Sequence, residues 1–190
     1  MYESISEYRD SASMIDECDI QRQVEELGML LNESKEGDII KWGDTQWIII
    51  EKTGDTCVAF SKEKYKTSPY SYYKGNPVTR YTWNNSRIKE LLNTDYYEQG
   101  INEAIKRRIR YDEEYDCNVR IIDIEEYTNN MDLLNSKISA AYWILDIDND
   151  NDKYGLTRTV TFYGGKKDSI EKKYKTTSLP IYPVVTLSLN

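Results

Sequence analysis

The stretch that decides the fold is DIIKWGDTQWIIIEKTGDTCVAF, residues 38–60. It contains three runs of apolar and β-branched residues, each short enough for a single strand. The runs are residues 38–42, 46–51 and 56–60. Gly43 and Gly54 each precede an aspartate in the polar segments between the runs, a composition typical of tight turns. The stretch is therefore predicted to form a β-meander of three strands.

The sequence before the meander has the pattern of one long amphipathic helix, residues 4–32. Its apolar residues follow mostly three-residue and four-residue spacings, as one face of a helix requires. They are Tyr8, Ala12, Ile15, Ile20, Val24, Leu27 and Leu31. A five-residue step separates Ile15 from Ile20, so we expect the helix to bend there or to change its packing partner. The polar residues and the glycine of 32–37 end the helix.

Helices and further strands are predicted beyond residue 60. Residues 61–81 contain two prolines and many tyrosines, and we expect a long surface loop there. Two helices should follow, the first capped by Asn84 or Asn85, with a break at residues 93–94 between them. The remaining predicted elements are a strand at 117–124, a short helix at 125–134, and strands at 140–147, 156–163 and 181–189.

The order of helix, strands, helices and strands favours an α+β fold over a doubly wound sheet. We expect a long N-terminal helix packed on an antiparallel sheet, followed by a second helix-plus-sheet unit. The boundary is predicted near residue 80. This gives an N-terminal helix plus β-meander at 1–80 and a second α+β unit at 81–190, with continuity between the two left open.

The chain of 190 residues is acidic, with a formal net charge of -8. Proteins that wrap nucleic acid need a basic face, so nucleic acid is not expected as a partner. The basic cluster at 106–110 is followed at once by an acidic run at 112–116, and it is interpreted as the solvated end of a helix. No stretch has the roughly 20 apolar residues of a membrane span, and no signal peptide is visible at the start.

The sequence shows no familiar catalytic machinery. It has no histidine, which excludes Ser-His-Asp and Cys-His nucleophile pairs and metal sites that need imidazole. Glycine-rich phosphate-binding motifs do not occur either. The aspartates of 146–152 resemble the start of a calcium loop, but the glycine and glutamate that such a loop requires are missing, so a polar hairpin loop is predicted. We therefore expect a protein that is not an enzyme, although catalysis by carboxylates or lysine is not excluded.

Cys18, Cys57 and Cys117 are far apart in the sequence and form no CxxC pair. Three arrangements are compatible with them: buried or free thiols, a structural zinc ion held by all three, or one disulfide with a third thiol left over. Acidic residues adjoin Cys18 and Cys117, and they hinder thiolate formation unless a cation is bound. Zinc is the one cofactor that the sequence suggests.

Several segments resemble an uncharacterised bacterial domain that is common in Gram-positive surface and secreted proteins. They are DIIKWG at 38–43, WIII at 47–50, TWNNSRIKELLNTDYY at 82–97, YWIL at 142–145 and YPVVTL at 182–187. The resemblance covers residues 37–189, with the motifs in the right order. It implies binding rather than chemistry, because some members look like C-type-lectin-like or pilin-tip domains.

The first residues, YESISEYRDSA at 2–12, are similar to the segment that follows the membrane-spanning half of a type IV pilin helix. This resemblance implies an extracellular pilin-like subunit of a pilus, with the N-terminal helix as its assembly spine and other pilin subunits as its partners. Contact with the membrane would come only through a segment upstream of residue 1. The strand-rich, tyrosine-rich remainder would be the exposed face, used for adhesion to a host surface.

Two other functions remain open. The first is a lectin-like module that binds a glycan without catalysis. Its candidate contact residues are Trp42, Trp83, Tyr70, Tyr72 and Tyr73. The second is a carboxylate-based hydrolase.

Overall fold

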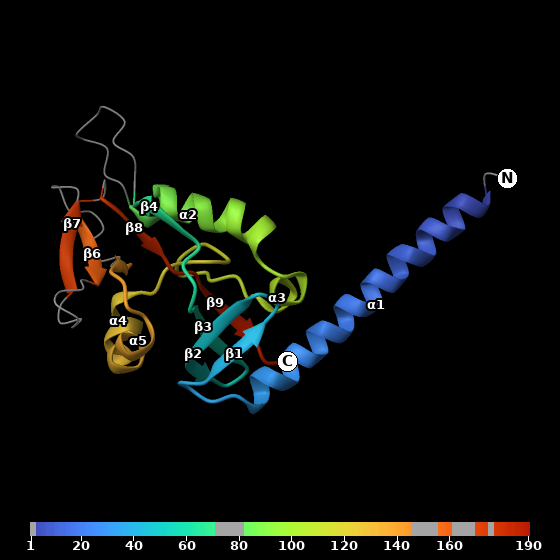
Figure 1. Cartoon of the computed structure of the whole chain (residues 1–190), viewed down its shortest axis with the longest axis horizontal. Coiled ribbons are helices and arrows are strands. Elements are labelled where there is room, and N and C mark those ends of the chain that lie inside the picture. Colours follow the sequence, from blue (N-terminus) through green and yellow to red (C-terminus); the bar gives the residue numbers. More distant parts are fainter. Residues whose placement is uncertain (1–2, 71–81, 146–155, 161–169, 175–176) are drawn as a thin grey trace.

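The computed structural model describes residues 3–70, 82–145, 156–160, 170–174 and 177–190, and it has the predicted α+β fold (Figure 1). The helices are α1 (Glu3–Glu33), the 3-10 turn η1 (Trp83–Asn85), α2 (Arg87–Leu91), the π-helix η2 (Leu92–Gly100), α3 (Glu103–Arg108), α4 (Ile124–Asn129) and α5 (Met131–Lys137). The strands are β1 (Ile39–Trp42), β2 (Thr45–Thr53), β3 (Thr56–Ser61), β4 (Lys66–Pro69), β5 (Tyr142–Trp143), β6 (Leu156–Val160), β7 (Ile170–Tyr174), β8 (Ser178–Ile181) and β9 (Val184–Ser188).

The main sheet is antiparallel and has the strand order β1-β2-β3-β9. Its first three strands are the meander predicted from residues 38–60. The fourth strand comes from the C-terminal end of the chain and places Val185 opposite Ala59. Both halves of the chain therefore supply strands to one sheet, and the expected boundary near residue 80 does not divide it.

The main sheet is buried on both faces, as the continuous apolar run of β2 indicates. Successive side chains of a strand point to opposite faces. Trp47 and Ile49 belong to a core cluster that also holds residues of α1, α2 and α3, whereas Ile48 and Ile50 belong to a second cluster with residues of α4 and α5. All four side chains are at most 2% exposed. Helices thus cover the sheet on both sides.

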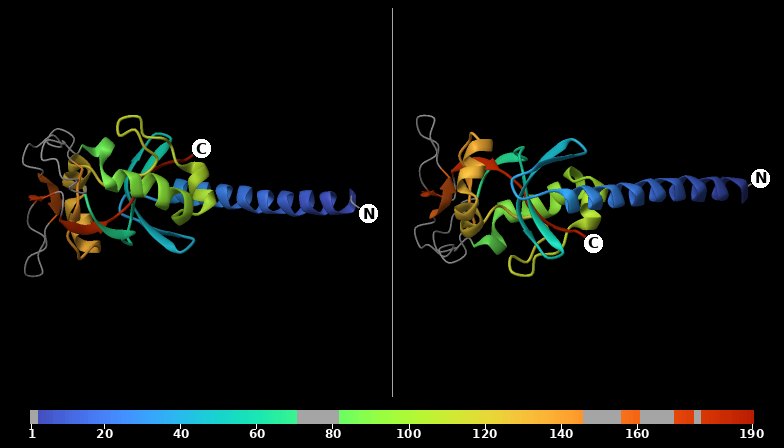
Figure 2. Two further views of the ribbon diagram at one scale, coloured as in Figure 1. Left: turned by 90° about the horizontal axis from the view of Figure 1, so that it is seen from above. Right: turned by 90° about the horizontal axis from the view of Figure 1, so that it is seen from below.

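Helix α1 forms over almost the same residues as predicted, but only its C-terminal part joins the body. Leu27 and Leu31 are buried in the core, whereas the side chains of residues 13–19 are exposed. Both views in Figure 2 show the helix leaving the body, with the N-terminus far from the sheet. A helix of 31 residues is about 46 Å long. The expected packing of the helix on the sheet therefore applies to its last turns.

The predicted surface loop at 61–81 is wrong for residues 66–69, which form β4. This strand pairs antiparallel with β8, placing Ser68 opposite Leu179. A backbone hydrogen bond from Tyr65 to the carbonyl of Ile181 precedes the pairing. The partner strand lies near the other end of the chain, so local sequence could not reveal it. Residues 71–81 lie outside the described residues.

The helical region after residue 82 differs from the prediction at both its start and its middle. Ser86, rather than Asn84 or Asn85, caps α2 by accepting a hydrogen bond from the backbone of Lys89. No break occurs at residues 93–94, because η2 continues from α2. The Asn93 side chain does not end the helix. Its amide group forms hydrogen bonds with backbone groups of Asn118 and Val119.

The predicted strand at 117–124 is wrong. The segment makes isolated bridges only, at Cys117, Arg120 and Asp123. Of the strand expected at 140–147, the described residues 140–145 contain β5 alone, while residues 146–147 lie outside the described residues. The strand expected at 181–189 is β9 alone. Strands β7 and β8 were not predicted. The second sheet, β5-β6-β7, lies at the end of the molecule opposite the N-terminus of α1 (Figure 1).

Tyrosine builds much of the core in a chain that has only two phenylalanines. The ring of Tyr142 packs near those of Phe60, Tyr127 and Tyr182, with centroid distances of 5.8, 6.3 and 5.3 Å. Such aromatic pairs contribute about 0.5–1.5 kcal/mol beyond the burial of their area. The expectation that the tyrosines form an exposed face is therefore wrong for these residues.

Candidate functional site

The N-terminal part of α1, residues 3–19, extends into solvent, away from the body (Figure 1). We call it the outer part of α1, and residues 20–33 are its inner part. Every side chain from residue 13 to residue 19 is exposed. Met14 and Ile15 are apolar, and they are 68% and 63% exposed. Because apolar side chains gain free energy on burial, a second molecule that covers Met14 and Ile15 would stabilise this segment. The outer part of α1 is therefore suited to contact another protein surface.

The inner part of α1 turns a different side to the body. Ile20 is half-buried, and Leu27 and Leu31 are buried. In a continuous helix five residues correspond to about 500°, so Ile15 and Ile20 point about 140° apart. The described residues show a change from exposure to burial at this step, rather than two different packing partners. Ile15 faces solvent, and the stripe that begins at Ile20 packs on the body.

Arg108 fastens α1 to the C-terminal segment. Its guanidinium donates to the carbonyls of Val24, Ser188 and Asn190 at 2.7, 3.0 and 3.1 Å. Gly28 makes room for it, because a Cβ at that position would lie 2.0 Å from Arg108 Nη2. The arginine is 8% exposed. Hydrogen bonds from a charged donor contribute about 1.5–3 kcal/mol each, so this contact holds the helix firmly.

Lys52 of β2 binds the C-terminal end of α1. Its Nζ donates to the carbonyls of Leu31, Asn32 and Ser34 at 2.9, 2.7 and 2.8 Å. The last carbonyls of a helix have no partner within the helix, and a cation is favourable there. The side chain of Asn32 adds a hydrogen bond to the carbonyl of Leu189 at 2.8 Å. The base of α1 is thus fixed by both the sheet and the C-terminus.

Arg107 contacts the exposed part of α1. Two of its nitrogens donate to the carboxylate oxygens of Glu17 at 2.5 and 2.8 Å, and this bond holds the pKa of Glu17 below its usual value. Its neighbours also have partners: Arg108 binds the carbonyls described above, and Arg110 donates to Asp55 at 2.5 Å. The interpretation of the basic cluster as a solvated helix end is therefore confirmed for its position in the last turn of α3 and for exposed Arg107, but it is wrong for Arg108, which is buried. The cluster ties α1, the C-terminus and the β2–β3 turn together.

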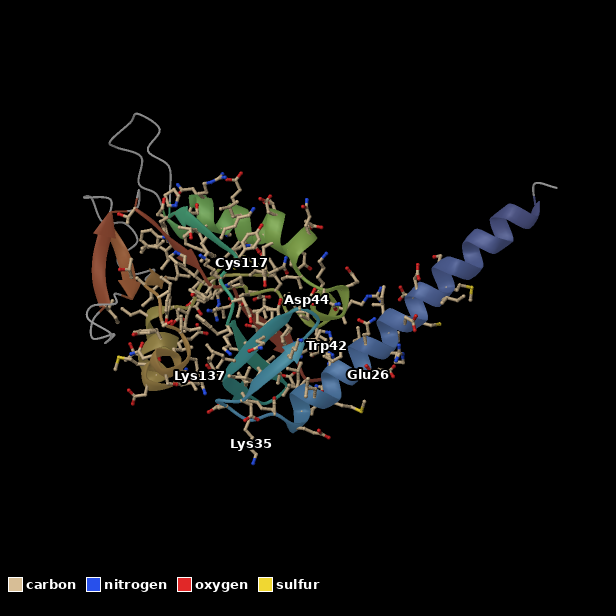
Figure 3. All side chains as sticks on the ribbon, in the orientation of Figure 1. Glu26, Lys35, Trp42, Asp44, Cys117 and Lys137 are labelled. Atoms are coloured by element: carbon tan, nitrogen blue, oxygen red, sulfur yellow. The ribbon has the colours of Figure 1, made fainter. Side chains whose placement is uncertain are left out.

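A cavity of about 260 Å³ lies between the β1–β2 turn and the junction of η2 with α3. Trp42 and Asp44 stand at the end of β1, beside α3 (Figure 3). Gly43 between them has a φ of 60°, a left-handed conformation that favours glycine. Aromatic, carboxylate and amide groups line this cavity, which we call the Trp42 cavity. They belong to Trp42, Asp44, Trp47, Tyr96, Gln99 and Asn102.

A second cavity, of about 300 Å³, is acidic and is lined in part by Arg120. Arg120 is 4% exposed and donates to both carboxylate oxygens of Glu126, at 2.6 and 2.5 Å, and to Asp112 at 3.1 Å. Burial alone would lower the pKa of Arg120, but these carboxylates outweigh burial and raise it. The carboxylates that touch Arg120 are therefore engaged in an ion network. This network holds the irregular segment where a strand was predicted.

The aromatic residues predicted as ligand contacts do not share one surface. Trp42 is half-buried and lines the Trp42 cavity. Trp83 is 3% exposed and donates from Nε1 to a backbone carbonyl at 2.8 Å, and Tyr70 is fully buried. The prediction is therefore wrong for Trp83 and Tyr70, because their rings belong to the core. Tyr72 and Tyr73 lie outside the described residues.

The three cysteines lie in different settings. Cys18 is exposed on α1, whereas Cys57 and Cys117 are buried, and all three thiols are free. Burial raises the pKa of Cys57 to about 11 and that of Cys117 to about 12. Across the described residues, no three cysteine, aspartate or glutamate side chains are placed to share a metal ion. The structure therefore does not bring the three cysteines together as a zinc site would require.

Sequence reasoning missed several groups that build these sites. Gln99 and Asn102 reach the Trp42 cavity from a part of the chain that is distant in sequence, so no local pattern connects them to Trp42. For the contact made by Arg108, the sequence did contain one signal. Gly28 interrupts a helical pattern, and a glycine there indicates that another group approaches closely.

No helix in the described part of the chain is both long enough and apolar enough to cross a membrane. No protein-family model, no curated protein and no solved structure matches the chain. The function is therefore inferred from the residues and their geometry.

Proposed function

We propose that the protein is a non-catalytic, pilin-like structural subunit that assembles with other copies through the outer part of α1. The observation that carries the proposal is the division of α1. Its inner part is fixed to the body, and its outer part extends into solvent with Met14 and Ile15 exposed. The resemblance to type IV pilins implies the same use of one helix as part of the domain and as the assembly spine. On this proposal the protein acts outside the cell, and its partners are other pilin subunits.

The exposed apolar pair supplies a driving force for association. Complete burial of Met14 and Ile15 would contribute about 1.5–3 kcal/mol each. Loss of translational, rotational and side-chain freedom cancels part of this gain, so a single contact between two copies is weak. In a filament each subunit contacts several neighbours, and weak contacts that form together add up to stable assembly.

Charge opposes this association at low ionic strength. The chain carries a formal net charge of -8, so two copies repel each other. Salt screens repulsion between exposed charges, with a screening length of about 10 Å at 0.1 M. Association through Met14 and Ile15 should therefore strengthen as salt is added. Association through ion pairs would weaken instead.

Cys18 offers a native reporter for the proposed contact. It lies three and four residues after Ile15 and Met14, so the three side chains are neighbours on the helix surface. The other two thiols are buried. A short bis-maleimide reagent added to the purified chain should therefore link two copies through Cys18. The yield of covalent dimer should rise with protein concentration and with salt.

Two matched variants test whether the apolar pair causes the contact. The double variant Met14→Glu/Ile15→Glu should reduce the dimer yield by about tenfold or more, because each 1.4 kcal/mol is a factor of ten. The control Met131→Glu changes an exposed methionine on α5 and should leave the yield unchanged. Equal yields from the double variant and the parent chain would refute the role of α1. Cys18→Ser should remove the product and confirm which thiol reacts.

A separate test addresses the pilus assignment. The native gene should encode an apolar segment of about 20 residues in frame upstream of residue 1, which would supply the membrane-spanning half of a pilin helix. Antibodies to the purified body should then label filaments on the surface of the source cells. An upstream sequence without such a segment would refute the pilin assignment, while the cross-linking result would still decide whether α1 associates.

A further inference from the structure

The Trp42 cavity combines an aromatic surface with polar side chains whose hydrogen-bonding groups are, among the described residues, only partly used. Trp42 is half-buried, so part of its ring is available at the edge of the cavity. Trp47 and Tyr96 also line the cavity and are 2% and 5% exposed. Most binding sites for small molecules are mainly apolar or aromatic, with a few polar groups that set orientation. The lining of this cavity fits that description.

The polar groups at the edge offer both donors and acceptors. In the part of the chain that the structure describes, the side chains of Asp44 and Gln99 make no hydrogen bond or salt bridge. Asn102 uses its Oδ1 to accept from the backbone of Ala104, and its Nδ2 group donates to no other described residue. Asp44 and Gln99 are exposed. A ligand that enters the cavity therefore meets a carboxylate and two amides ready to bind it.

We infer that the Trp42 cavity binds one ring of a neutral saccharide. A pyranose has a C–H face that packs on an aromatic ring and hydroxyl groups that both donate and accept. Trp42 would contact the ring face, Asp44 would accept from hydroxyl groups, and Gln99 and Asn102 would bond their oxygens. The volume of about 260 Å³ lies below the roughly 300–1,000 Å³ of drug-sized pockets, which suits a single ring.

A hydrogen-bond donor of the cavity favours a saccharide over an organic cation. Aromatic rings with one carboxylate also suit a quaternary ammonium group. A cation, however, brings no acceptor for the Nδ2 donor of Asn102, whereas a hydroxyl group does. The observations therefore favour a saccharide. The inference does not rest on assembly through α1, because the two involve different residues.

A glycan array tests the inference directly, with the purified full chain as the probe protein. Neutral glycans built from glucose, galactose, mannose and N-acetylglucosamine should give binding. Titration of the strongest one should change tryptophan fluorescence, because Trp42 lies in the site. Tetramethylammonium chloride serves as the cation probe. Absence of binding to every neutral glycan, or binding of tetramethylammonium in its place, would overturn the inference.

Variants locate the site. Trp42→Ala should reduce affinity by about tenfold or more, and Asp44→Asn and Gln99→Ala should each weaken it about three- to tenfold, as expected for one hydrogen bond. Tyr111→Ala removes an aromatic ring that is 52% exposed and does not line the cavity, so it should bind as the parent chain does. Asp44 and Gln99 are on the surface, so their variants test the site even if Trp42→Ala unfolds. Unchanged affinity in both would overturn the assignment to this cavity.

Discussion

The substitution Gly28→Ala brings two effects into opposition. In a helix interior, alanine is favoured over glycine by about 0.5–1 kcal/mol. In this protein the added Cβ would lie 2.0 Å from Nη2 and 2.5 Å from Cζ of Arg108. The guanidinium would have to move away from the carbonyls of Val24, Ser188 and Asn190. Helix propensity thus predicts stabilisation, and the Arg108 contact predicts destabilisation.

The hydrogen bonds decide the expected sign. Each of the three contributes about 1.5–3 kcal/mol, and if the displaced guanidinium loses about half of this total, the loss is about 2–4 kcal/mol. After the gain in helix propensity is subtracted, Gly28→Ala should lower the free energy of unfolding by about 1–3 kcal/mol. For a chain of this length, the Tm should fall by roughly 2–12 °C. Urea and thermal unfolding followed by circular dichroism measure both quantities.

A double-mutant cycle isolates the contact. Arg108→Met removes the guanidinium and keeps most of the apolar stem. In that background Gly28→Ala should raise the free energy of unfolding by up to about 1 kcal/mol, since only helix propensity remains. A Gly28→Ala protein at least as stable as the parent would refute the reasoning, as would the same effect in both backgrounds.

Three further outcomes follow from burial and charge. Near pH 8, about the ordinary pKa of a thiol, Cys18 alone should react with a thiol reagent. The reason is that burial raises the pKa of Cys57 to about 11 and that of Cys117 to about 12. Two thiols that become reactive only on chelation would instead support a zinc site. The pKa of Glu17 is lowered in the folded protein, so its stabilising contribution is present above the unfolded pKa and is lost as pH falls through the folded pKa. Urea midpoints across this acid range should therefore fall less in Glu17→Gln than in the parent chain, and equal falls would contradict the role of this pair. Arg120→Met should lower the free energy of unfolding by about 3–5 kcal/mol, because it leaves buried carboxylates unpaired, and a loss below about 1 kcal/mol in urea unfolding would contradict the ion network.

Local periodicity predicted the elements whose own sequence pattern repeats within a few residues. The meander of 38–60 follows from short apolar runs and two glycine turns, and α1 follows from its three- and four-residue spacing. The five-residue step after Ile15 coincides with the point where the helix passes from exposed to partly buried side chains. The strand expected at 117–124 failed for the opposite reason. Its apolar residues are buried by contacts with distant segments, and Arg120 is held by carboxylates rather than by a strand ladder.

The candidate sites were predicted only in part. Trp42 was one of the predicted contact residues, and it lines a cavity. Trp83 and Tyr70 have the same aromatic character, yet both are in the core. Residue type cannot separate these cases, because an aromatic ring is equally suited to a core and to a binding surface. Whether a ring belongs to the core or to a binding surface depends on which other residues cover it in the tertiary structure.

By itself, the sequence determined the α+β class, the N-terminal helix, the meander and the absence of imidazole chemistry. These depend on composition and on patterns that repeat within a few residues. Only the tertiary structure decided that β9 completes the first sheet, that Arg108 binds carbonyls from both ends of the chain, and that Gln99 and Asn102 join Trp42 around one cavity. The physical reason is that each of these contacts joins segments far apart in the chain. Their pairing is chosen by burial and hydrogen bonding in the folded molecule, which no local pattern encodes.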